Sequence, residues 1–419
     1  MIPFKKHVLK NGLTLIVHED RSTPIIAVNI TYKTGSRNEN PEQTGLAHLF
    51  EHLMFGGSRH VKDFDTPIQN AGGENNAFTN NDITSFHCMM PAENIDTALW
   101  LESDRMADLH LTQKKLDNQK SVVIEEFKET CLNEPYGDVW HLLSALVYKQ
   151  HPYRWPVIGL IPDHISSVTL EDAQAFYKTY YQPANAVMTI AGPIGFQEAL
   201  EKCQYWFEDI PSIPLAPIEL PQEVPQTEKR HLEIEANVPS DAIYMAFPMS
   251  DRLSPEYYTT DLLSDVLSNG RSSRLYQRLQ KEKELFNSID AYITGYADPG
   301  IFIIEGKLNP GVTMEQAEEA IWEELRELHH SLISDDELQK LKNKTESTIT
   351  FQECNVMTKA INLSLFESLG DADLINREVA MYQSIQAEDL QAYARELFVP
   401  EKASVLYYKR SPDADAEEE

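Results

Sequence analysis

The sequence predicts an α+β protein built from two similarly folded halves. Stretches rich in Val, Ile and Thr alternate with amphipathic stretches that are typical of helices. Residues 167–190 and 384–407 align without a gap, which indicates an internal duplication. Five prolines between residues 211 and 225 separate the two copies by a segment that can form neither a helix nor a central strand. We therefore expect mixed, mostly antiparallel sheets packed with helices, in two halves arranged like a clam shell.

Local composition predicts the elements of the first half. Residues 13–20 and 25–35 flank the turn-forming stretch around Ser22, so we predict a strand pair. A helix predicted from Leu46 to Phe55 ends at two glycines, which adopt the left-handed cap conformation at little cost. Further predicted elements are a strand at residues 84–91 and helices at residues 94–109 and 114–132.

Both copies of the repeat have the same local pattern. Each reads as a helix that leads through a proline into a strand, with Pro183 matching Pro400 and Ala186 matching Ala403. Two halves of about 200 residues each agree with ordinary domain sizes.

The charge balance restricts the classes of partner. The formal net charge is −30 at pH 7, with 24% charged and 42% hydrophobic residues. Nucleic acid and anionic membranes would repel such a chain, whereas cationic ligands such as basic peptides would be attracted. The simpler interpretation is that the charge keeps the protein soluble. Because no window approaches 18 apolar residues and the N-terminus lacks an apolar signal segment, we expect no membrane span and a cytoplasmic location, or a periplasmic one if a signal peptide has been removed.

A compact group of polar residues lies in the helix predicted at 46–55. His48, Glu51 and His52 occupy positions i, i+3 and i+4, which share one helical face. Two histidines spaced in this way can bind one zinc ion, and the glutamate can act as general base on a water molecule. The alternative is a helix with two hydrogen-bonded histidines and an exposed glutamate. A catalytic zinc site needs a third protein ligand, which would come from another segment.

Six further segments have a recognisable pattern. They are FKKHVLKNGLTLIVHED, TGLAHLFEHLMFGGS, AGGENNAFTNNDITSFHCMMP, VVIEEFKE, PYGDVWHLLSALVYKQHPYRWPVIG and FYKTYYQPANAVMTIAG. Together with the duplication, by which the match spans almost the whole chain, they resemble the insulinase/pitrilysin family of zinc peptidases, and most of all its mitochondrial-processing-peptidase branch. The resemblance implies a metallopeptidase with one Zn²⁺ per chain that cleaves unfolded peptides or oligopeptides in an enclosed chamber.

The resemblance also assigns the remaining metal site. The family's third ligand is the last glutamate of a pattern that falls here on residues 119–126, so Glu126 is favoured over Glu125 and Glu129. Gln119 stands where the family has a supporting glutamate, and Glu129 is a neighbour one turn from Glu125. Both are expected near the metal without contacting it.

The segment GGENNAFTNNDITSFHCMMP resembles the family's substrate-holding edge strand, to which a peptide adds as an extra strand. By this match Asn76 and Ala77 would contact the substrate near the scissile bond. The alternative is a turn followed by a core strand, and for Phe78 we favour the core interpretation.

The second half lacks the metal motif, because His48, Glu51 and His52 align with Leu262, Asp265 and Val266. In the family this half supplies an arginine and a tyrosine that bind substrate and stabilise the oxyanion. The matching positions are Gln280 and Asn287, whereas Arg278 and Tyr292 are out of register.

The missing pair predicts that this chain is the metal-bearing subunit of a heterodimer whose homologous partner carries the Arg/Tyr pair. A self-sufficient homodimeric peptidase is the alternative. A non-catalytic assembly subunit, like the core subunits of respiratory complex III, and a peptide-binding module with structural zinc are further readings, which the intact motif disfavours. The predicted domains are a catalytic half at 1–210, a linker at 211–229, a degenerate half at 230–410 and an acidic tail at 411–419.

Overall fold

The computed structural model describes residues 1–213, 215 and 218–412. The chain forms two compact units that are interleaved along the sequence. The first unit comprises Met1–Phe127, Trp155–Leu220 and Ile349–Arg377, and the second comprises the intervening segments and the chain from Glu378 onward. The predicted division of the duplicated sequence into two halves with a linker at 211–229 stays a prediction. Residues 214, 216–217 and 413–419, which belong to the predicted linker and tail, lie outside the described residues.

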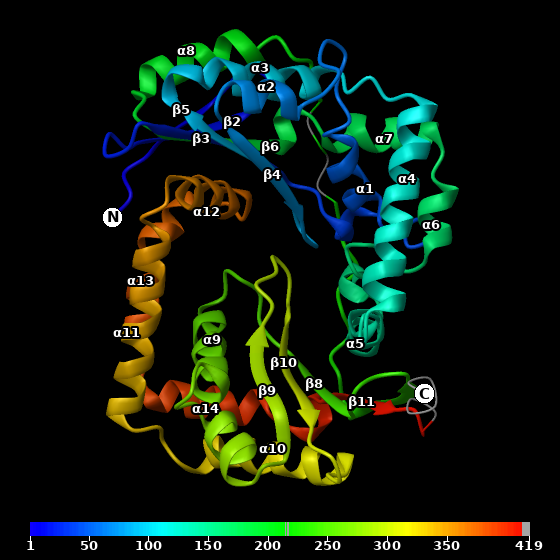
Figure 1. The fold of residues 1–419 in the computed structure, drawn as a ribbon. Helices are drawn as coiled ribbons and strands as arrows, with labels where there is room; N and C mark the ends of the chain where they lie inside the picture. Colours follow the sequence, from blue (N-terminus) through cyan, green and yellow to red (C-terminus); the bar gives the residue numbers. More distant parts are fainter. Residues whose placement is uncertain (214, 216–217, 413–419) are drawn as a thin grey trace. The chain divides into compact units, whose positions relative to one another are not determined.

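The first unit is built on a six-stranded sheet (Figure 1). Strand β2 (Thr14–Glu19) runs parallel to β6 (Ala186–Gly192), and the other neighbouring pairs are antiparallel. The order across the sheet is β1 (Lys5–Val8), β2 (Thr14–Glu19), β6 (Ala186–Gly192), β3 (Ile25–Tyr32), β5 (Thr84–Pro91) and β4 (Glu74–Thr79).

The predicted strand pair is not a pair. Both segments form strands, as β2 and β3, but β6 lies between them. All seven residues of β6 are buried. A strand buried in this way needs hydrogen-bonding partners on both edges, so it takes a central place in the sheet.

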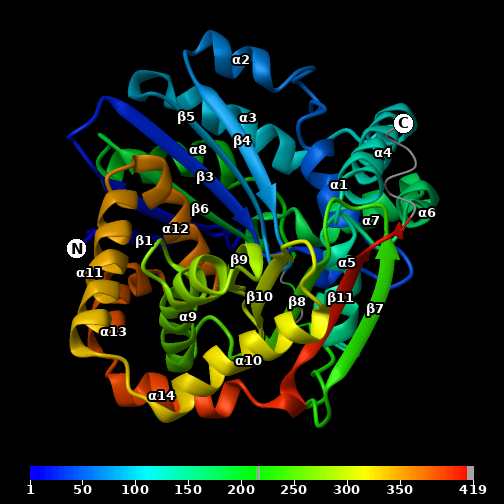
Figure 2. The ribbon, with the colours of Figure 1, turned by 60° about the horizontal axis from the view of Figure 1, so that its bottom comes forward.

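Helices cover both faces of this sheet, as Figures 1 and 2 show. Ile26, Val28 and Ile30 of β3 pack in one core with α3 and α8. Ala27, which points to the other face, packs against α12. The helices of this unit are α1 (Leu46–Leu53), α2 (Asp65–Asn70), α3 (Ile95–Ala107), α4 (Gln113–Phe127), α6 (Pro162–Ser167), α7 (Leu170–Tyr180), α8 (Phe196–Phe207) and α12 (Val356–Ser368).

The second unit repeats the strand order of the first in a five-stranded sheet. Strand β11 (Ser404–Arg410) is parallel to β7 (Arg230–Ala236), and the remaining neighbours are antiparallel. Its strands, in order, are β7 (Arg230–Ala236), β11 (Ser404–Arg410), β8 (Ala242–Pro248), β10 (Ile301–Leu308) and β9 (Phe286–Ile293). They correspond in order to β2, β6, β3, β5 and β4, so the predicted fold class of two similar α/β halves is confirmed.

Helices also cover both faces of the second sheet. On one face, Ala242, Tyr244 and Ala246 of β8 pack with α5 (Val139–Val147). On the other face, Phe247 contacts Trp322 of α10 (Met314–His330). The helices here are α5 (Val139–Val147), α9 (Pro255–Ser268), α10 (Met314–His330), α13 (Glu378–Ser384) and α14 (Ala387–Leu397). The longer α11 (Asp335–Gln352) begins in this unit and ends in the other.

The repeated segments adopt the predicted path. In the first copy α7 leads through a 3-10 turn at Pro183–Asn185 into β6, and in the second α14 leads through Pro400–Lys402 into β11. Proline begins both turns because its fixed φ suits the first position of a helical turn.

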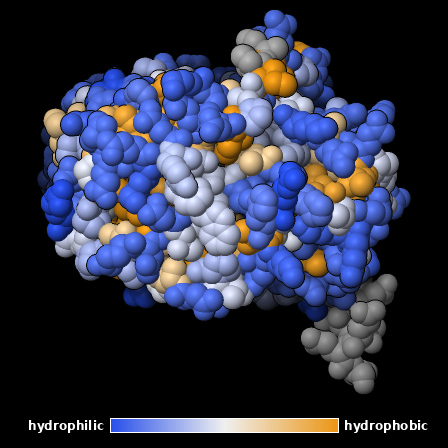
Figure 3. Space-filling model, turned by 90° about the horizontal axis from the view of Figure 1, so that it is seen from above, coloured by the Kyte–Doolittle hydropathy of each residue, from blue (hydrophilic) through white to orange (hydrophobic). Residues whose placement is uncertain are grey.

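The surface agrees with the acidic composition. The face seen in Figure 3 is mostly hydrophilic, and its apolar residues are scattered in small groups. Within the described ranges, no helix combines the length and the apolar character that crossing a membrane requires.

Candidate metal centre

Helix α1 has one apolar face and one polar face. Leu46, Leu49, Phe50 and Leu53 recur at the spacing of one helical face and are buried in the core of the first unit. The other face carries the three residues of the predicted motif. Gly45 precedes the helix with φ of 89°, and a Cβ there would lie 2.7 Å from the carbonyl oxygen of Ile158, so glycine is required.

A buried carboxylate holds the N-terminus of α1. The two carboxylate oxygens of Glu39 accept hydrogen bonds from the backbone N–H groups of Gly45 (2.9 Å) and Ala47 (2.8 Å). These N–H groups lack partners within the helix, so the Glu39 oxygens satisfy donors that would otherwise be buried without an acceptor. Glu39 therefore fixes the first turn, from which His48 projects.

Burial raises the pKa of Glu39 to about 8, although its N–H donors act in the opposite direction. The folded state then holds a proton that the unfolded chain loses near pH 4.5, so this contribution to stability is full below that pH and declines toward pH 8. We expect the difference in unfolding free energy between wild type and Glu39→Gln to shrink by about 3 kcal/mol from pH 5 to pH 8. Urea unfolding of the metal-free proteins measures it, with exposed Glu42→Gln as control, and parallel curves would contradict it.

The structure brings together the three predicted metal ligands. Nε2 of His48 lies 3.7 Å from one carboxylate oxygen of Glu126, and Nε2 of His52 lies 3.3 Å from the other. One potential ligand atom from each of the three residues lies within 4.8 Å of the others. Glu126 reaches this position because α4 contacts α1 and buries the adjacent Val123 and Phe127. Among the described residues, His48, His52 and Glu126 are the group whose ligand atoms lie close enough together to hold one metal ion. Glu125 and Glu129 do not belong to this group.

The donor set suits a zinc ion. Two imidazoles and one carboxylate form the three-ligand set of a catalytic zinc site. Burial, and then the neighbouring His52, lower the pKa of His48 to about 4, so at neutral pH its imidazole is neutral and has a lone pair available. No described residue hydrogen-bonds to Nδ1 of His48, which is buried.

Glu51 lies beside this cluster, half-buried on the same face of α1. The hydroxyl of Thr79, the last residue of β4, donates a hydrogen bond to Glu51 Oε2 at 2.6 Å. Burial raises the pKa of the Glu51 carboxyl, and the bond from Thr79 lowers it. A carboxylate in this position can accept and return a proton.

The other predicted site residues lie outside the three-residue cluster, on three different segments. Asn76 and Ala77 lie on β4, at the edge of the sheet and on the strand that reaches Glu51. Gln119 lies on α4, two helical turns before Glu126. Glu129 is exposed in a π-helical stretch, Lys128–Asn133, that follows α4, so the regular helical face on which it was predicted ends before it.

Sequence reasoning missed Thr79 and Glu39. A signal existed for Thr79, because it lies two residues after Ala77 and so shares a strand face with it. For Glu39 the sequence offered only an acidic residue before a helix, and the fold of the loop decides which N–H groups it reaches.

The corresponding region of the second unit has no equivalent cluster among its described residues. Asp265, which matches Glu51, hydrogen-bonds instead with Asn269 and Thr345. Gln280 donates to the backbone oxygen of Asn287 at 2.6 Å, so the two positions that match the family's arginine and tyrosine are adjacent.

The two out-of-register residues are engaged elsewhere. Arg278 pairs with Glu324 and Glu327, and the hydroxyl of Tyr292 donates to Glu305. Both side chains therefore have carboxylate partners within the second unit.

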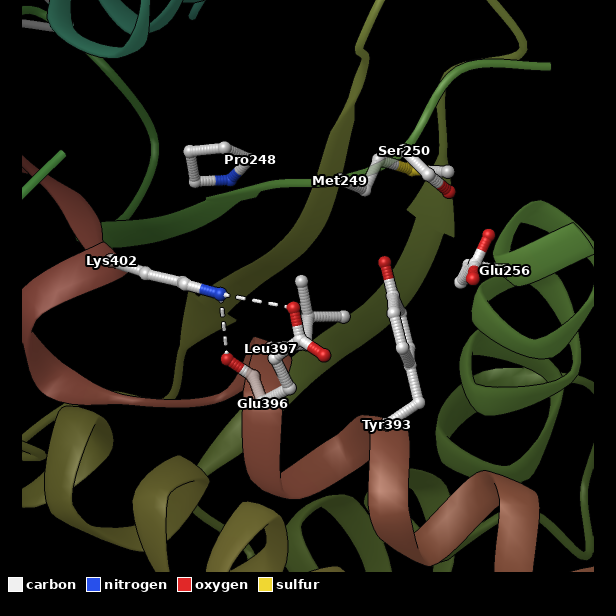
Figure 4. A pocket seen from close by; sticks show the side chains of 8 residues that line it. All are labelled: Pro248, Met249, Ser250, Glu256, Tyr393, Glu396, Leu397 and Lys402. Atoms are coloured by element: carbon white, nitrogen blue, oxygen red, sulfur yellow. Dashed lines mark hydrogen bonds and ion pairs between the residues drawn. The ribbon is translucent and has the colours of Figure 1, made fainter. Parts of the chain in front are cut away.

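A separate pocket of about 310 Å³ lies in the second unit (Figure 4). Its one lysine, Lys402, already pairs with Glu396, both through the carboxylate and through the backbone oxygen at 2.9 Å. Tyr393 and Glu256 line the same space. With its charges partly balanced internally and no ligand cluster, this pocket is a weaker candidate than the site on α1.

Comparison with known proteins agrees with the geometry on α1. The family model described as Insulinase (Peptidase family M16) matches residues 14–159, and that described as Peptidase M16 inactive domain matches residues 167–345. The chain is 28% identical over 411 residues to the zinc protease PqqE of Helicobacter pylori, covering 96% of this chain and 91% of the relative. It is 24% identical over 406 residues to a Bacillus subtilis protein named as the uncharacterized zinc protease YmxG, covering 96% of this chain and 97% of the relative.

A solved structure extends the likeness to the whole fold. The crystal structure of a protease from Helicobacter pylori superposes with a TM-score of 0.93 at 26% identity, covering 98% of this chain and 100% of that one. Two models of one family match consecutive parts of the sequence, and relatives named as zinc proteases match it nearly end to end. The predicted resemblance is confirmed: the chain belongs to the insulinase family of peptidases, peptidase family M16.

Proposed function

We propose that the chain is a zinc-dependent endopeptidase that hydrolyses unfolded peptides or oligopeptides. The observation that carries this proposal is the convergence of His48, His52 and Glu126 beside the carboxylate of Glu51. The named zinc proteases among its relatives support the same reaction class. We propose one Zn²⁺ per chain, held by these three ligands. The enclosed chamber that the family resemblance implies remains a prediction.

The proposed chemistry divides between the metal and Glu51. A bound zinc ion would supply Lewis acidity, which activates a water molecule and polarises the scissile carbonyl. Glu51 accepts the proton of the attacking water at its carboxylate and delivers it to the nitrogen of the leaving amine. Burial of this side chain keeps the carboxylate in a less polar setting, where it is a stronger base than in water.

Strand β4 is the proposed site for the peptide backbone. It pairs with β5 on one side and forms the edge of its sheet. The N–H of Ala77 donates to the side-chain oxygen of the preceding Asn76 at 2.8 Å, and a substrate carbonyl could replace that acceptor. Adding a strand at this edge would hold a peptide through its backbone and largely independently of its side chains. Asn76 and Ala77 are accordingly the proposed substrate contacts.

We further propose that the active form is a heterodimer with a homologous subunit that supplies the Arg/Tyr pair. Gln280 and Asn287 occupy the matching positions, and Arg278 and Tyr292 are bound to carboxylates within the second unit. A homodimer that works without the pair is the alternative.

The first experiment is cleavage of a quenched-fluorescent, unstructured peptide by the purified chain. The protein is assayed metal-free and with one equivalent of zinc. Zinc-dependent cleavage supports the proposed function and shows that the chain acts without a heterologous partner. If zinc binds without cleavage, the assay is repeated with a homologous chain that carries the pair, and continued inactivity would contradict the peptidase proposal.

We expect a preference for basic peptides. The net charge is −30, and Glu74, the first residue of β4, is exposed beside the proposed substrate edge. Electrostatic attraction raises the association rate of cationic ligands and weakens with added salt. Two peptides of equal length, one Arg-rich and one Glu-rich around the same cleavage site, are compared at low and high salt. Equal kcat/KM values for the two at low salt would remove this expectation.

A further inference from the structure

We propose that Thr79 is a positioning residue for Glu51, an inference that rests on the proposed peptidase function. Its hydroxyl lies 2.6 Å from Glu51 Oε2, and an ionised carboxylate can only accept, so Thr79 is the donor. The proposed base is therefore held by a side chain at the end of the neighbouring strand β4.

This contact restricts a side chain that otherwise has several rotamers. Glutamate has three rotatable side-chain bonds, whereas threonine is branched at Cβ and stiff. Thr79 is itself held at the end of β4, where it pairs with Thr84, and the hydroxyl of Thr84 donates to the backbone oxygen of Thr34 at 3.0 Å. The donor is thus fixed to the sheet, and it fixes the carboxylate oxygen in turn.

The same strand would hold the substrate. Asn76 and Ala77, the proposed substrate contacts, lie three and two residues before Thr79 on β4. A peptide paired with this edge and the carboxylate held by Thr79 would share one rigid element. Positioning of the reacting groups relative to one another, rather than affinity for the peptide, should therefore depend on the Thr79 hydroxyl.

The alternative is that Thr79 is an ordinary strand residue whose hydroxyl uses a convenient acceptor. Thr79→Val removes the hydroxyl and keeps the branched shape, and Thr79→Ser keeps the hydroxyl. The zinc-loaded proteins are compared by kcat and KM for one peptide, by zinc affinity in competition with a chelator, and by thermal midpoint.

For Thr79→Val we expect kcat to fall roughly 10- to 100-fold, the range for losing a hydrogen bond to a charged group. KM and zinc affinity should stay within about 3-fold of wild type, because neither metal ligands nor substrate contacts change, and Thr79→Ser should restore most of kcat. Thr79→Ala repeats the test without the hydroxyl if the valine does not fit.

The matched control is Thr31→Val. Thr31 is a buried threonine of the same sheet whose hydroxyl bonds to Asn29 at 3.0 Å rather than to Glu51. It should lower the thermal midpoint and leave kcat unchanged. Three results would overturn the positioning role. The first is a wild-type kcat in both Thr79→Val and Thr79→Ala, and the second is a kcat of Thr79→Ser as low as that of Thr79→Val. The third is a loss of zinc binding in the Thr79 variants. A wild type that binds zinc but shows no turnover with any partner would instead overturn the proposed function itself.

Discussion

Replacing Glu51 with glutamine is expected to lower kcat roughly 10²- to 10⁴-fold, the range for removing a general base. The amide has nearly the same volume, and its oxygen can still accept the bond from Thr79, but it cannot take a proton from water. His48, His52 and Glu126 are unchanged, so the zinc content of the purified variant should equal that of wild type. The measurement is steady-state kcat on a quenched-fluorescent peptide together with metal analysis of the same sample.

The exposed Glu42, which lies just before α1, provides the control for this substitution. Glu42→Gln changes the net charge equally and lies outside the cluster, so its kcat should match wild type. If Glu51→Gln retains turnover, a group other than Glu51 acts as the general base. One that loses zinc would show that Glu51 supports the metal rather than the proton transfer.

The parts of the fold that follow from local sequence were predicted well. Strand β5 has the predicted bounds, 84–91, because branched and apolar residues there are bracketed by turn-forming residues. Helix α1 ends within two residues of its predicted end, where Gly56 and Gly57 follow. The repeat predicted the path from α7 to β6, since the same residues produce the same turn in both copies.

The parts that depend on distant pairing were not predicted. The sequences of β2 and β3 identify strands, but nothing local indicates that β6, more than 150 residues later, lies between them. The same holds for α12. Only the complete fold places Val356 and Ala360 of this helix against the sheet of the first unit. Register and layer are set by which surfaces remain to be buried after the local elements have formed.

The residues of the candidate site also differ in whether local sequence or the complete fold determines their positions. His48, Glu51 and His52 are local to one helix, so their spacing alone predicts a shared face. Glu126 lies on another helix, and its assignment came from the family resemblance rather than from spacing. Thr79 and Glu39 hold the site through contacts that depend on how a strand end and a loop meet α1. These contacts could not be derived before the fold was known.

The assignment of Glu126 gives the second large expected effect. Glu126→Gln should weaken zinc binding by more than the 10- to 100-fold typical of an outer-shell substitution, because a neutral amide replaces a charged ligand. Glu125→Gln and Glu129→Gln remove the same charge from neighbouring positions that lie outside the cluster, so they should bind zinc like wild type. Zinc affinity, measured by chelator competition without any substrate, separates the three independently of turnover. If Glu125→Gln or Glu129→Gln loses zinc while Glu126→Gln binds it like wild type, the third ligand is the residue whose replacement loses zinc. The proposed metal centre would then need a different register of the helix that carries this ligand.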